Sequence, residues 1–283
     1  MRAESNWNEF REGPGGSSFV FVGLRSVALV GLCVAVSAGA GSGVVARQPY
    51  LADVDPHEGV ARAHAMPVQG IDVSNWQGDI EWNKVRAAGT QFAFIKATEG
   101  GDYLDPKFAQ NWQAAKSVGI PRGAYHMVYW CRAAHEQALW FILNVPNDPD
   151  ALPPVLDLEW NGHSRGCPKR IPVKLALEKV KIMLEVMEAH TGKRPIIYTD
   201  VTFHREVLEG QLPGYNFWLR SVAAEPQEIY RYRPWLFWQF TTTGYVPGIE
   251  KPVDRNVFNG NFGDWRQVLP ARAPAKQSVR NAN

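Results

Sequence analysis

Residues 154–160 read Pro-Val-Leu-Asp-Leu-Glu-Trp, an apolar run that ends in two acidic side chains. We predict that this run is a strand, and because side chains alternate along a strand, Asp157 and Glu159 point to the same face. Their Cα atoms would then be roughly 6.6 Å apart. Two carboxylates at that distance cannot both ionise cheaply, so we expect a raised pKa, assigned to Glu159. A neutral acid beside a charged carboxylate is what cleavage of a glycosidic bond requires.

Similar apolar runs recur along the chain and alternate with helical patterns. Strands are predicted at 70–74, 92–97, 122–128, 154–160 and 195–199, and each is followed by a helix, at 81–88, 105–119, 133–144, 172–192 and 203–208. Three more strands are predicted with no helix between them, at 217–220, 236–241 and 253–257. Alternating strands and helices imply a parallel sheet, and eight strands can close as a barrel.

The predicted fold class is therefore α/β, an irregular TIM-like barrel of five β/α units followed by three β-strands. A doubly wound open sheet is the alternative, but no Gly-rich phosphate-binding fingerprint follows the first strand. The chain has 283 residues, 45% of them hydrophobic, which is enough for one large core. Its formal net charge of only +2 argues against a nucleic-acid partner.

The N-terminal region has the pattern of an export signal. Arg25 precedes the apolar run 27–36, and the small residues 38–40 follow, so a secretory signal cut near Ala40 is predicted. The uncharged stretch 26–46 could also cross a bilayer as a helix of ~20 residues, so an uncleaved membrane anchor remains the alternative. We expect an exported protein, periplasmic or extracellular, either free or membrane-anchored.

The remaining boundaries follow from composition. We predict four regions: a signal peptide or anchor at 1–46, a linker at 47–67, the barrel at 68–270 and a polar tail at 271–283. Cys131 and Cys167 are the cysteines outside the export segment, and in an exported domain they are expected to pair. Closing that loop would contribute roughly 4 kcal/mol to stability. Two free buried thiols are the alternative, and neither cysteine has partners at the spacing of a metal site.

Further acidic and aromatic residues lie at strand ends, which converge on one mouth in a barrel. The acids are Asp72, Glu99 and Asp254, and a divalent metal site is disfavoured because no pair of histidines accompanies them. The aromatic residues that we expect to bind substrate are Tyr125, Tyr198, Trp218 and Trp238. A buried Trp is by default a core residue, but aromatic rings near carboxylates also suit sugar rings.

Five ordered motifs resemble glycoside hydrolase family 25, the N-acetylmuramidase-type lysozymes. They span about residues 68–260 and are Gly70-Ile71-Asp72-Val73-Ser74 with Trp76-Gln77-Gly78, Phe94-Ile95-Lys96-Ala97-Thr98-Glu99-Gly100, Gly123-Ala124-Tyr125-His126, Pro154-Val155-Leu156-Asp157-Leu158-Glu159, and Trp238-Gln239-Phe240-Thr241 with Val246-Pro247-Gly248 and Val253-Asp254. The resemblance implies the barrel already predicted. It also implies hydrolysis of the β-1,4 bond between N-acetylmuramic acid and N-acetylglucosamine in peptidoglycan.

The resemblance also implies roles for individual residues. Glu159 matches the general acid, Asp157 its essential neighbour, and Asp72 and Asp254 the flanking aspartates, while Glu99 matches a further acid that we place among the substrate-binding residues. The implied partner is the peptidoglycan glycan strand. We expect no cofactor and no metal, and a monomer. The cysteine pair is not a general feature of the family.

Two other functions remain to be separated from this one. The first is a sugar- or peptidoglycan-binding barrel without catalysis, against which all four central acids argue. The second is a chitinase-type hydrolase, whose longer run of spaced aspartates before the Glu is missing here. For the mechanism we favour the substrate's own 2-acetamido group as nucleophile, oriented by Asp157. Asp157 as direct nucleophile, or as base for an inverting water, stays open.

Overall fold

The computed structural model describes residues 59–270. The predicted signal peptide or anchor at 1–46, the first part of the linker and the polar tail at 271–283 lie outside the described residues. The end of the predicted linker contains the short helix α1 (Ala61–Ala65), whose Ala63 is fully buried. No helix between residues 59 and 270 is both long and apolar enough to span a bilayer.

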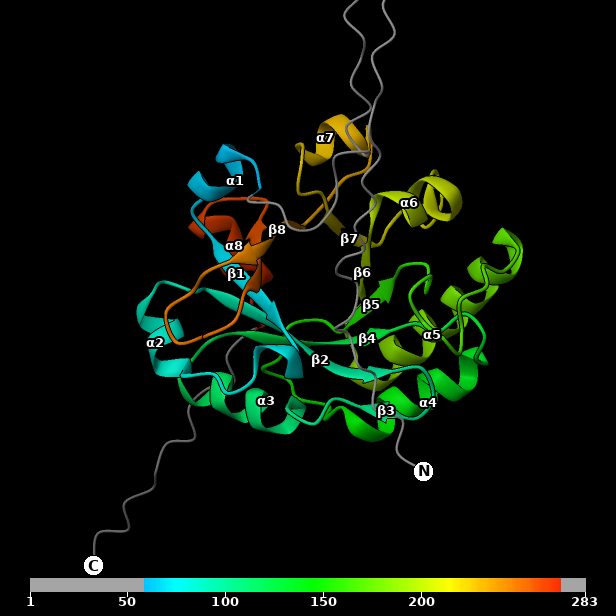
Figure 1. Ribbon diagram of the computed structural model, residues 1–283, viewed down its shortest axis with the longest axis horizontal. Coiled ribbons are helices and arrows are strands. Elements are labelled where there is room, and N and C mark those ends of the chain that lie inside the picture. The colour runs from blue at the N-terminus through cyan, green and yellow to red at the C-terminus, as the bar shows by residue number, and fades with distance from the viewer. Residues whose placement is uncertain (1–58, 271–283) are drawn as a thin grey trace, which may run out of the picture. The chain divides into compact units, whose positions relative to one another are not determined.

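The described residues form a closed barrel of strands, which confirms the predicted fold class (Figure 1). The strands are β1 (Gln69–Val73), β2 (Phe92–Glu99), β3 (Tyr103–Leu104), β4 (Arg122–Met127), β5 (Val155–Leu158), β6 (Ile196–Thr199), β7 (Asn216–Arg220), β8 (Phe237–Gly244) and β9 (Val253–Phe258). They follow one another in the order β1, β9, β8, β7, β6, β5, β4 and β2, and β1 also pairs with β2, which closes the ring. The two-residue β3 forms a hairpin with β2 outside the ring.

The barrel is parallel except at β9. The pairs from β1 through β2, β4, β5, β6, β7 and β8 are parallel, whereas β9 is antiparallel to both β8 and β1. A parallel neighbour needs a long crossover, usually a helix, while a short loop turns the chain back on itself. The absence of a helix between the last two predicted strands therefore has a direct consequence, which is that the final strand enters the barrel in the opposite direction.

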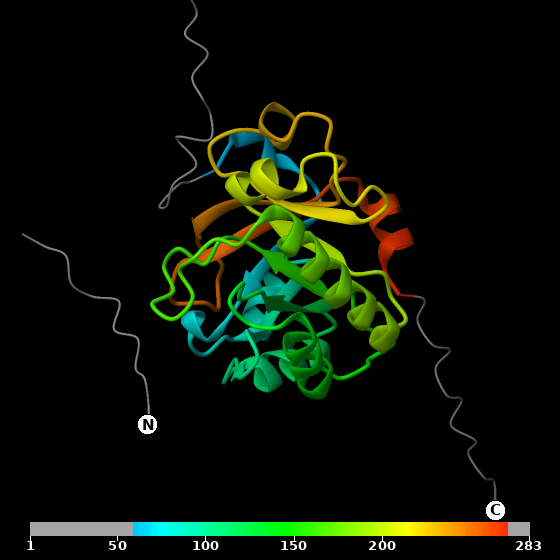
Figure 2. The ribbon, with the colours of Figure 1, turned by 90° about the vertical axis from the view of Figure 1, so that its right-hand side faces the viewer.

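The predicted helices are present on the outside of the barrel. They are α2 (Trp82–Ala87), α3 (Phe108–Ser117), α4 (Ala134–Asn144), α5 (Val173–Thr191) and α6 (Val201–Phe203), which continues as a π-helical turn through residues 204–208. Figure 2 shows the long helix α5 lying across the outer face of the strands. Besides α1, two short helices were not predicted: α7 (Pro226–Ile229) lies between β7 and β8, where no helix was expected, and α8 (Phe262–Val268) follows β9.

One end of the barrel interior is filled by aromatic rings. The rings of Phe92 and Phe94 pack against Phe237, and Trp265 of α8 packs on both Phe92 and Phe237. Gly123 makes room for this layer, since a Cβ atom there would lie 2.7 Å from the ring of Phe94. The filled layer leaves the other end of the barrel, where the parallel strands terminate, for polar side chains.

Candidate active site

The polar layer follows from the alternation of side chains along the strands. Three strands each place an apolar residue in the aromatic layer and a polar residue two positions further along: Val155 then Asp157, Ile196 then Tyr198, and Phe237 then Gln239. Residues two apart on a strand share a face, so each polar side chain lies directly above the filled interior. This is the end of a barrel at which catalytic groups are usually found.

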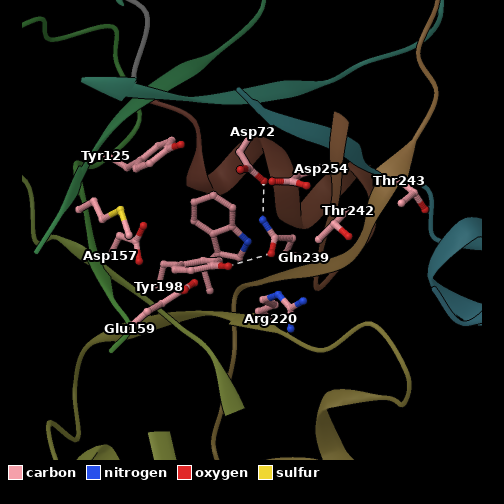
Figure 3. A pocket seen from close by; sticks show the side chains of 12 residues that line it. Asp72, Tyr125, Asp157, Glu159, Tyr198, Arg220, Gln239, Thr242, Thr243 and Asp254 are labelled. Carbon is pink, nitrogen blue, oxygen red and sulfur yellow. Dashed lines mark hydrogen bonds between the residues drawn. The ribbon is translucent and has the colours of Figure 1, made fainter. Parts of the chain in front are cut away.

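The polar end of the barrel holds a cavity of about 560 Å³. Its lining residues are Asp72, Tyr125, Met127, Asp157, Glu159, Tyr198, Trp218, Arg220, Gln239, Thr242, Thr243 and Asp254. All four predicted central acids are among them, together with three of the four predicted aromatic residues. Figure 3 shows Asp157 and Glu159 on one side of the cavity and Asp72 and Asp254 on the other.

Asp72 is held by hydrogen bonds from two neighbouring side chains. Gln239 Nε2 donates to Asp72 Oδ2 at 2.9 Å, and Asn256 Nδ2 donates to the same oxygen at 2.8 Å. Asp254 lies directly across the β1–β9 pair from Asp72. Burial raises the pKa of Asp72, and the bonds from Asn256 and Gln239 partly offset that rise by stabilising the charged form.

Both amides are themselves fixed by aromatic donors. The Tyr198 hydroxyl donates to Gln239 Oε1 at 2.8 Å, and the Trp218 indole N–H donates to Asn256 Oδ1 at 2.7 Å. Because each amide oxygen accepts a hydrogen bond, each amide nitrogen is turned towards Asp72. Two of the predicted substrate-binding aromatics therefore also orient the groups that hold this carboxylate.

Asp157 is buried without comparable support. Its side chain is 9% exposed, and its Oδ1 has no hydrogen-bond partner among the described residues. Burial raises the pKa of Asp157 well above its usual range, the nearby charge of Glu159 raises it further, and Lys96 lowers it in part. Asp157 is the more deeply buried of the two, whereas Glu159, for which the sequence predicts a raised pKa, is half-buried.

Two predicted substrate-binding residues do not line the cavity. Trp238 is fully buried on the outer face of β8, where its indole N–H donates to the carbonyl of Ser221 at 2.7 Å. Its neighbours Phe237 and Gln239 face inward, so alternation turns Trp238 away from the cavity.

Glu99 is the second of these residues. It forms an ion pair with Lys96 at the end of β2. The pairing of β2 with β4 shifts register between Lys96 and Thr98, so simple alternation does not predict where Glu99 points. Neither residue lines the cavity, and contact of Trp238 or Glu99 with substrate stays a prediction.

Sequence reasoning missed several cavity residues. Gln239 was quoted in a motif and Asn256 lies on the same face of β9 as Asp254, but neither was predicted to hold Asp72. Arg220 is two residues after Trp218, so the alternation that placed the tryptophan could also have found the arginine. Thr242 and Thr243 lie in the part of β8 where its pairing with β9 shifts register, between Thr241 and Gly244. Alternation therefore does not predict that they face the cavity.

The cysteines and the metal-binding capacity complete the description of the site. Cys131 and Cys167 form a disulfide with a Cα–Cα distance of 5.5 Å, which links the loop after β4 to the loop after β5. No group of three or more His, Cys, Asp and Glu side chains within residues 59–270 is arranged to hold a metal ion. The chemistry available at the cavity is that of carboxyl, hydroxyl, amide and guanidinium groups.

A barrel whose strand ends bring paired carboxyl groups into one cavity has the arrangement that barrel hydrolases of glycosidic bonds use. The model of glycosyl hydrolases family 25 matches residues 71–249. The chain belongs to this family, which confirms the resemblance seen in the sequence motifs.

Relatives and solved structures agree with this membership. Lysozyme M1 of Streptomyces globisporus is 35% identical over 214 residues, which is 71% of this chain and 71% of the relative. A family 25 glycosyl hydrolase from Bacillus anthracis superposes with a TM-score of 0.68 at 33% identity and covers 76% of this chain and 98% of its own. A lysozyme from Streptomyces coelicolor superposes with a TM-score of 0.63 at 34% identity and covers 73% of this chain and 98% of its own.

Proposed function

We propose that this protein is a muramidase that hydrolyses the β-1,4 bond between N-acetylmuramic acid and N-acetylglucosamine in peptidoglycan. The observation that carries the proposal is the pair Asp157 and Glu159, which faces the cavity from the end of β5. Membership of family 25 and the likeness to Lysozyme M1 support the same substrate.

Glu159 is the proposed general acid. It lies at the mouth side of the pair and is half-buried, so it can reach the oxygen of a bound glycosidic bond. Two carboxyl groups this close titrate as a unit. Because the pKa of Asp157 is raised by burial and by Glu159, the pair retains a proton to higher pH than a solvated carboxyl would. That proton is available to Glu159 when the leaving oxygen needs it.

The proposed nucleophile is the substrate's 2-acetamido group. Asp157 and Glu159 project from one strand, so they reach the bond from the same side and are poorly placed to flank it. The acetamido oxygen would attack C1 as the C1–O bond breaks and Glu159 transfers its proton to the leaving oxygen. Water then attacks C1, the C1–acetamido oxygen bond breaks, and the proton of the water returns to Glu159. The oxygen of Asp157 that lacks a partner supports its role in orienting the acetamido group.

The other lining residues are the proposed sugar-binding surface. Tyr125, Tyr198 and Trp218 present aromatic rings to the cavity, and such rings pack well on the C–H faces of sugars. Burial raises the pKa of both Tyr125 and Tyr198 well above the usual value, so both hydroxyls stay protonated. The Tyr125 hydroxyl can donate to a sugar, while the Tyr198 hydroxyl donates to Gln239. Asp72 and Asp254 are proposed to line the cavity on the opposite side of the bound sugar.

The cellular setting is also part of the proposal. We propose that the protein is exported, since the Cys131–Cys167 disulfide is of the kind that persists in oxidising compartments. We also propose that it acts as a monomer. N-terminal sequencing of the exported protein distinguishes a signal cut near Ala40 from a retained membrane anchor. Size-exclusion chromatography with light scattering tests the monomeric state.

Digestion of purified peptidoglycan tests the activity. We expect release of reducing ends, and mass analysis of the products should find N-acetylmuramic acid at the reducing terminus. Reducing N-acetylglucosamine would identify a different bond and overturn the assignment. A parallel digestion of chitin oligosaccharides separates a chitinase, and binding without release of reducing ends would identify a barrel that has lost catalysis.

A further inference from the structure

The backbone of Glu159 lies just outside the barrel ladder. Strand β5 ends at Leu158, whose register partner on β6 is Thr199, and no strand pairing includes Glu159. The residue that we propose as the acid is therefore the first one beyond the rigid sheet. Contacts outside the ladder therefore help to fix the backbone at this point.

That support comes from Trp130, in the loop of residues 128–133 between β4 and α4. The indole N–H of Trp130 donates a hydrogen bond to the backbone carbonyl of Glu159. Trp130 is 1% exposed and stacks on Phe203 with ring centroids 4.8 Å apart. The ring of Trp160, the residue after Glu159, packs edge-on against Trp130 at 5.5 Å. The indole that holds Glu159 therefore cannot swing away without breaking this aromatic packing.

Two further links join the loop to the segment that follows Glu159. Asn161 is 6% exposed and uses both ends of its amide: its Oδ1 accepts from the Trp130 backbone N–H at 3.0 Å, and its Nδ2 donates to the Val128 carbonyl at 2.8 Å. The Cys131–Cys167 disulfide supplies a covalent link six residues beyond Asn161. Contacts from residues 128, 130 and 131 thus all reach the stretch 159–167.

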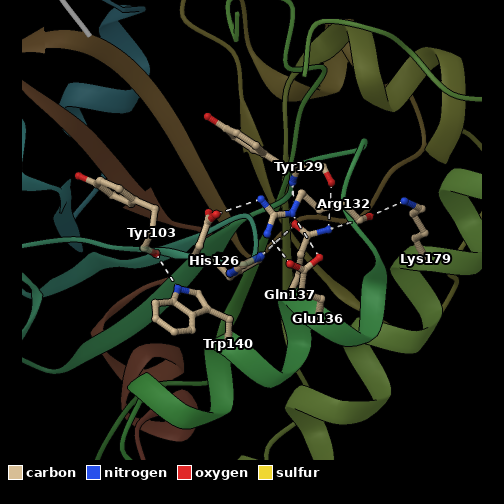
Figure 4. Close-up of polar contacts among 9 residues, drawn as sticks. Tyr103, His126, Tyr129, Arg132, Glu136, Gln137, Trp140 and Lys179 are labelled. Atoms are coloured by element: carbon tan, nitrogen blue, oxygen red, sulfur yellow. Dashed lines mark hydrogen bonds and ion pairs between the residues drawn. The ribbon is translucent and has the colours of Figure 1, made fainter. Parts of the chain in front are cut away.

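The loop is also fixed from the helices behind it (Figure 4). Gln137 of α4 is fully buried; its Oε1 accepts from the Tyr129 N–H at 2.7 Å, and its Nε2 donates to the Tyr129 carbonyl at 2.9 Å. Lys179 of α5 donates to the Trp130 carbonyl at 2.9 Å and also to the Arg132 carbonyl. The loop is a braced element between two helices and the end of β5.

We propose that Trp130 is a positioning residue that fixes the backbone of Glu159, and so aims its carboxyl at the scissile oxygen, while Asn161 and the Cys131–Cys167 disulfide hold Trp130 in place. The inference rests on the proposed role of Glu159 as the acid. A displacement of a reacting group by about 1 Å can lower turnover by about 10²-fold. Trp130, Asn161 and the disulfide therefore act on the chemical step rather than on sugar binding.

The test begins with Trp130→Phe, which keeps an aromatic ring against Phe203 and removes the N–H donor. We expect kcat on peptidoglycan fragments to fall about 10-fold or more with KM nearly unchanged, and the pH profile of kcat to shift, because the spacing of the Glu159 and Asp157 carboxyls changes. The matched control is Trp140→Phe. It removes an indole N–H that donates to the Tyr103 carbonyl at 2.8 Å, a hydrogen bond that does not involve Glu159. The control should leave kcat and its pH profile unchanged.

A double-variant comparison with Glu159→Gln locates the effect. In the wild-type background, Trp130→Phe should lower turnover about 10-fold. If Trp130 acts through the Glu159 carboxyl, the same substitution in the Glu159→Gln background should lower the residual turnover very little. An equal fold-loss in both backgrounds would overturn the proposal. So would a lower melting temperature with kcat and the pH profile intact, which is what a packing role alone predicts.

The second arm removes the covalent link, in case Trp130→Phe fails to fold. Cys131→Ser with Cys167→Ser should lower the melting temperature, lower kcat at a temperature where the variant is folded, and shift the pH profile in the same direction as Trp130→Phe. An unchanged kcat per folded molecule would overturn the proposal that the disulfide helps to hold Trp130 in place. A wild-type protein that releases no reducing ends would refute the proposed function itself, and that result is distinct from any of these.

Discussion

The two acidic sides of the cavity are both buried, but they are built differently. Asp72 on β1 is 6% exposed, and one of its oxygens accepts two amide hydrogen bonds. Asp157 on β5 is 9% exposed, and its Oδ1 has no partner in the described part of the chain. Burial raises the pKa of both, but amide donors offset the rise at Asp72, whereas the charge of Glu159 adds to it at Asp157.

The Asp72 carboxyl is thus fixed by hydrogen bonds within the protein, whereas the Asp157 carboxyl keeps an oxygen with which it can bind a ligand. A buried oxygen left without a hydrogen bond costs about 1–3 kcal/mol, and such groups cluster at sites where a ligand or a reaction uses them. Asp72 already engages its neighbours and so sets the shape of the site. Asp157, with Glu159 beside it, is the side at which we expect the chemistry, and four predictions test that division.

The largest effect is expected for Glu159→Gln. The substitution keeps the side-chain shape and removes the proton, so the melting temperature should change little. General acid catalysis contributes roughly 10²–10⁴-fold, and a sugar hydroxyl is a poor leaving group, so we expect a loss near the upper end. Release of reducing ends from peptidoglycan measures it. If most of the activity survives, the acid is another carboxyl that lines the cavity.

Asp157→Asn should come second, with a loss in turnover of about 10²-fold or more, since the pair can no longer share its proton. This change should also alter stability with a definite dependence on pH. The pKa of Asp157 is higher in the folded protein than in the unfolded chain, so the folded state binds this proton more tightly. The stabilisation is fully present below the ordinary Asp pKa of about 4 and is lost as pH rises through the folded pKa.

Asparagine does not titrate, so it avoids that loss. The melting temperature of Asp157→Asn minus that of the wild type should therefore grow as pH rises from 4 to 7. Thermal melts of both proteins across this range measure the difference. A gap that narrows with rising pH would mean that Asp157 is ionised and stabilised in the fold, and would remove the contrast with Asp72.

Asp72→Asn should have a smaller effect on both measurements. The two amide donors end on a single oxygen, and an asparagine carbonyl can take its place. We expect turnover to fall up to about 10²-fold as the cavity wall loses its charge, with a pH-dependent gap in melting temperature smaller than that of Asp157→Asn. The same variant series at Asp254 serves as a comparison. If the pH-dependent difference in melting temperature were larger for Asp72→Asn than for Asp157→Asn, the roles that we assign to the two aspartates would be reversed.

The smallest effect is expected for Trp218→Phe, which removes the donor that orients Asn256. One hydrogen bond contributes about 1 kcal/mol, so a change of a few-fold in kcat/KM is expected from the less firmly held Asp72. Trp238→Phe is the matched control, because its indole N–H binds the Ser221 carbonyl on the outer face of the wall. It should lower stability and leave kcat/KM unchanged. Equal kinetic losses in both would show that general packing matters, not the Asp72 side.

The β/α units could be predicted because their signals are local. The stripe of α5 repeats on one face over five turns, and the run before Asp157 is apolar with a clear end. Alternation alone then placed Asp157 and Glu159 together. The helices α7 and α8 were missed because four and seven residues are too short to establish a period.

The donors that hold Asp72 were harder to predict than the direction in which Trp238 points. Along residues 236–241, Phe237, Gln239 and Thr241 share one face, while the other face carries only Leu236, Trp238 and Phe240, so the polar residues mark the face that excludes Trp238. The donors to Asp72 depend on the register between β1 and β9, which pairs Asp72 with Asp254. That register joins residues about 180 positions apart, and it is fixed by closure of the whole barrel rather than by any local pattern.

The pairing of β1 with β9 also bears on how the protein comes into being. A chain is synthesised from its N-terminus, at about 5–20 residues per second. Strand β1 thus waits with one edge open until residues 253–258 arrive, and Asn256, which holds Asp72, is 184 positions behind its partner. A nascent chain, or one truncated before β9, carries Asp157 and Glu159 but not the wall that faces them. The finished cavity exists only once the last strand has been made, so a partly synthesised chain inside the cell has no complete site with which to act on a glycan.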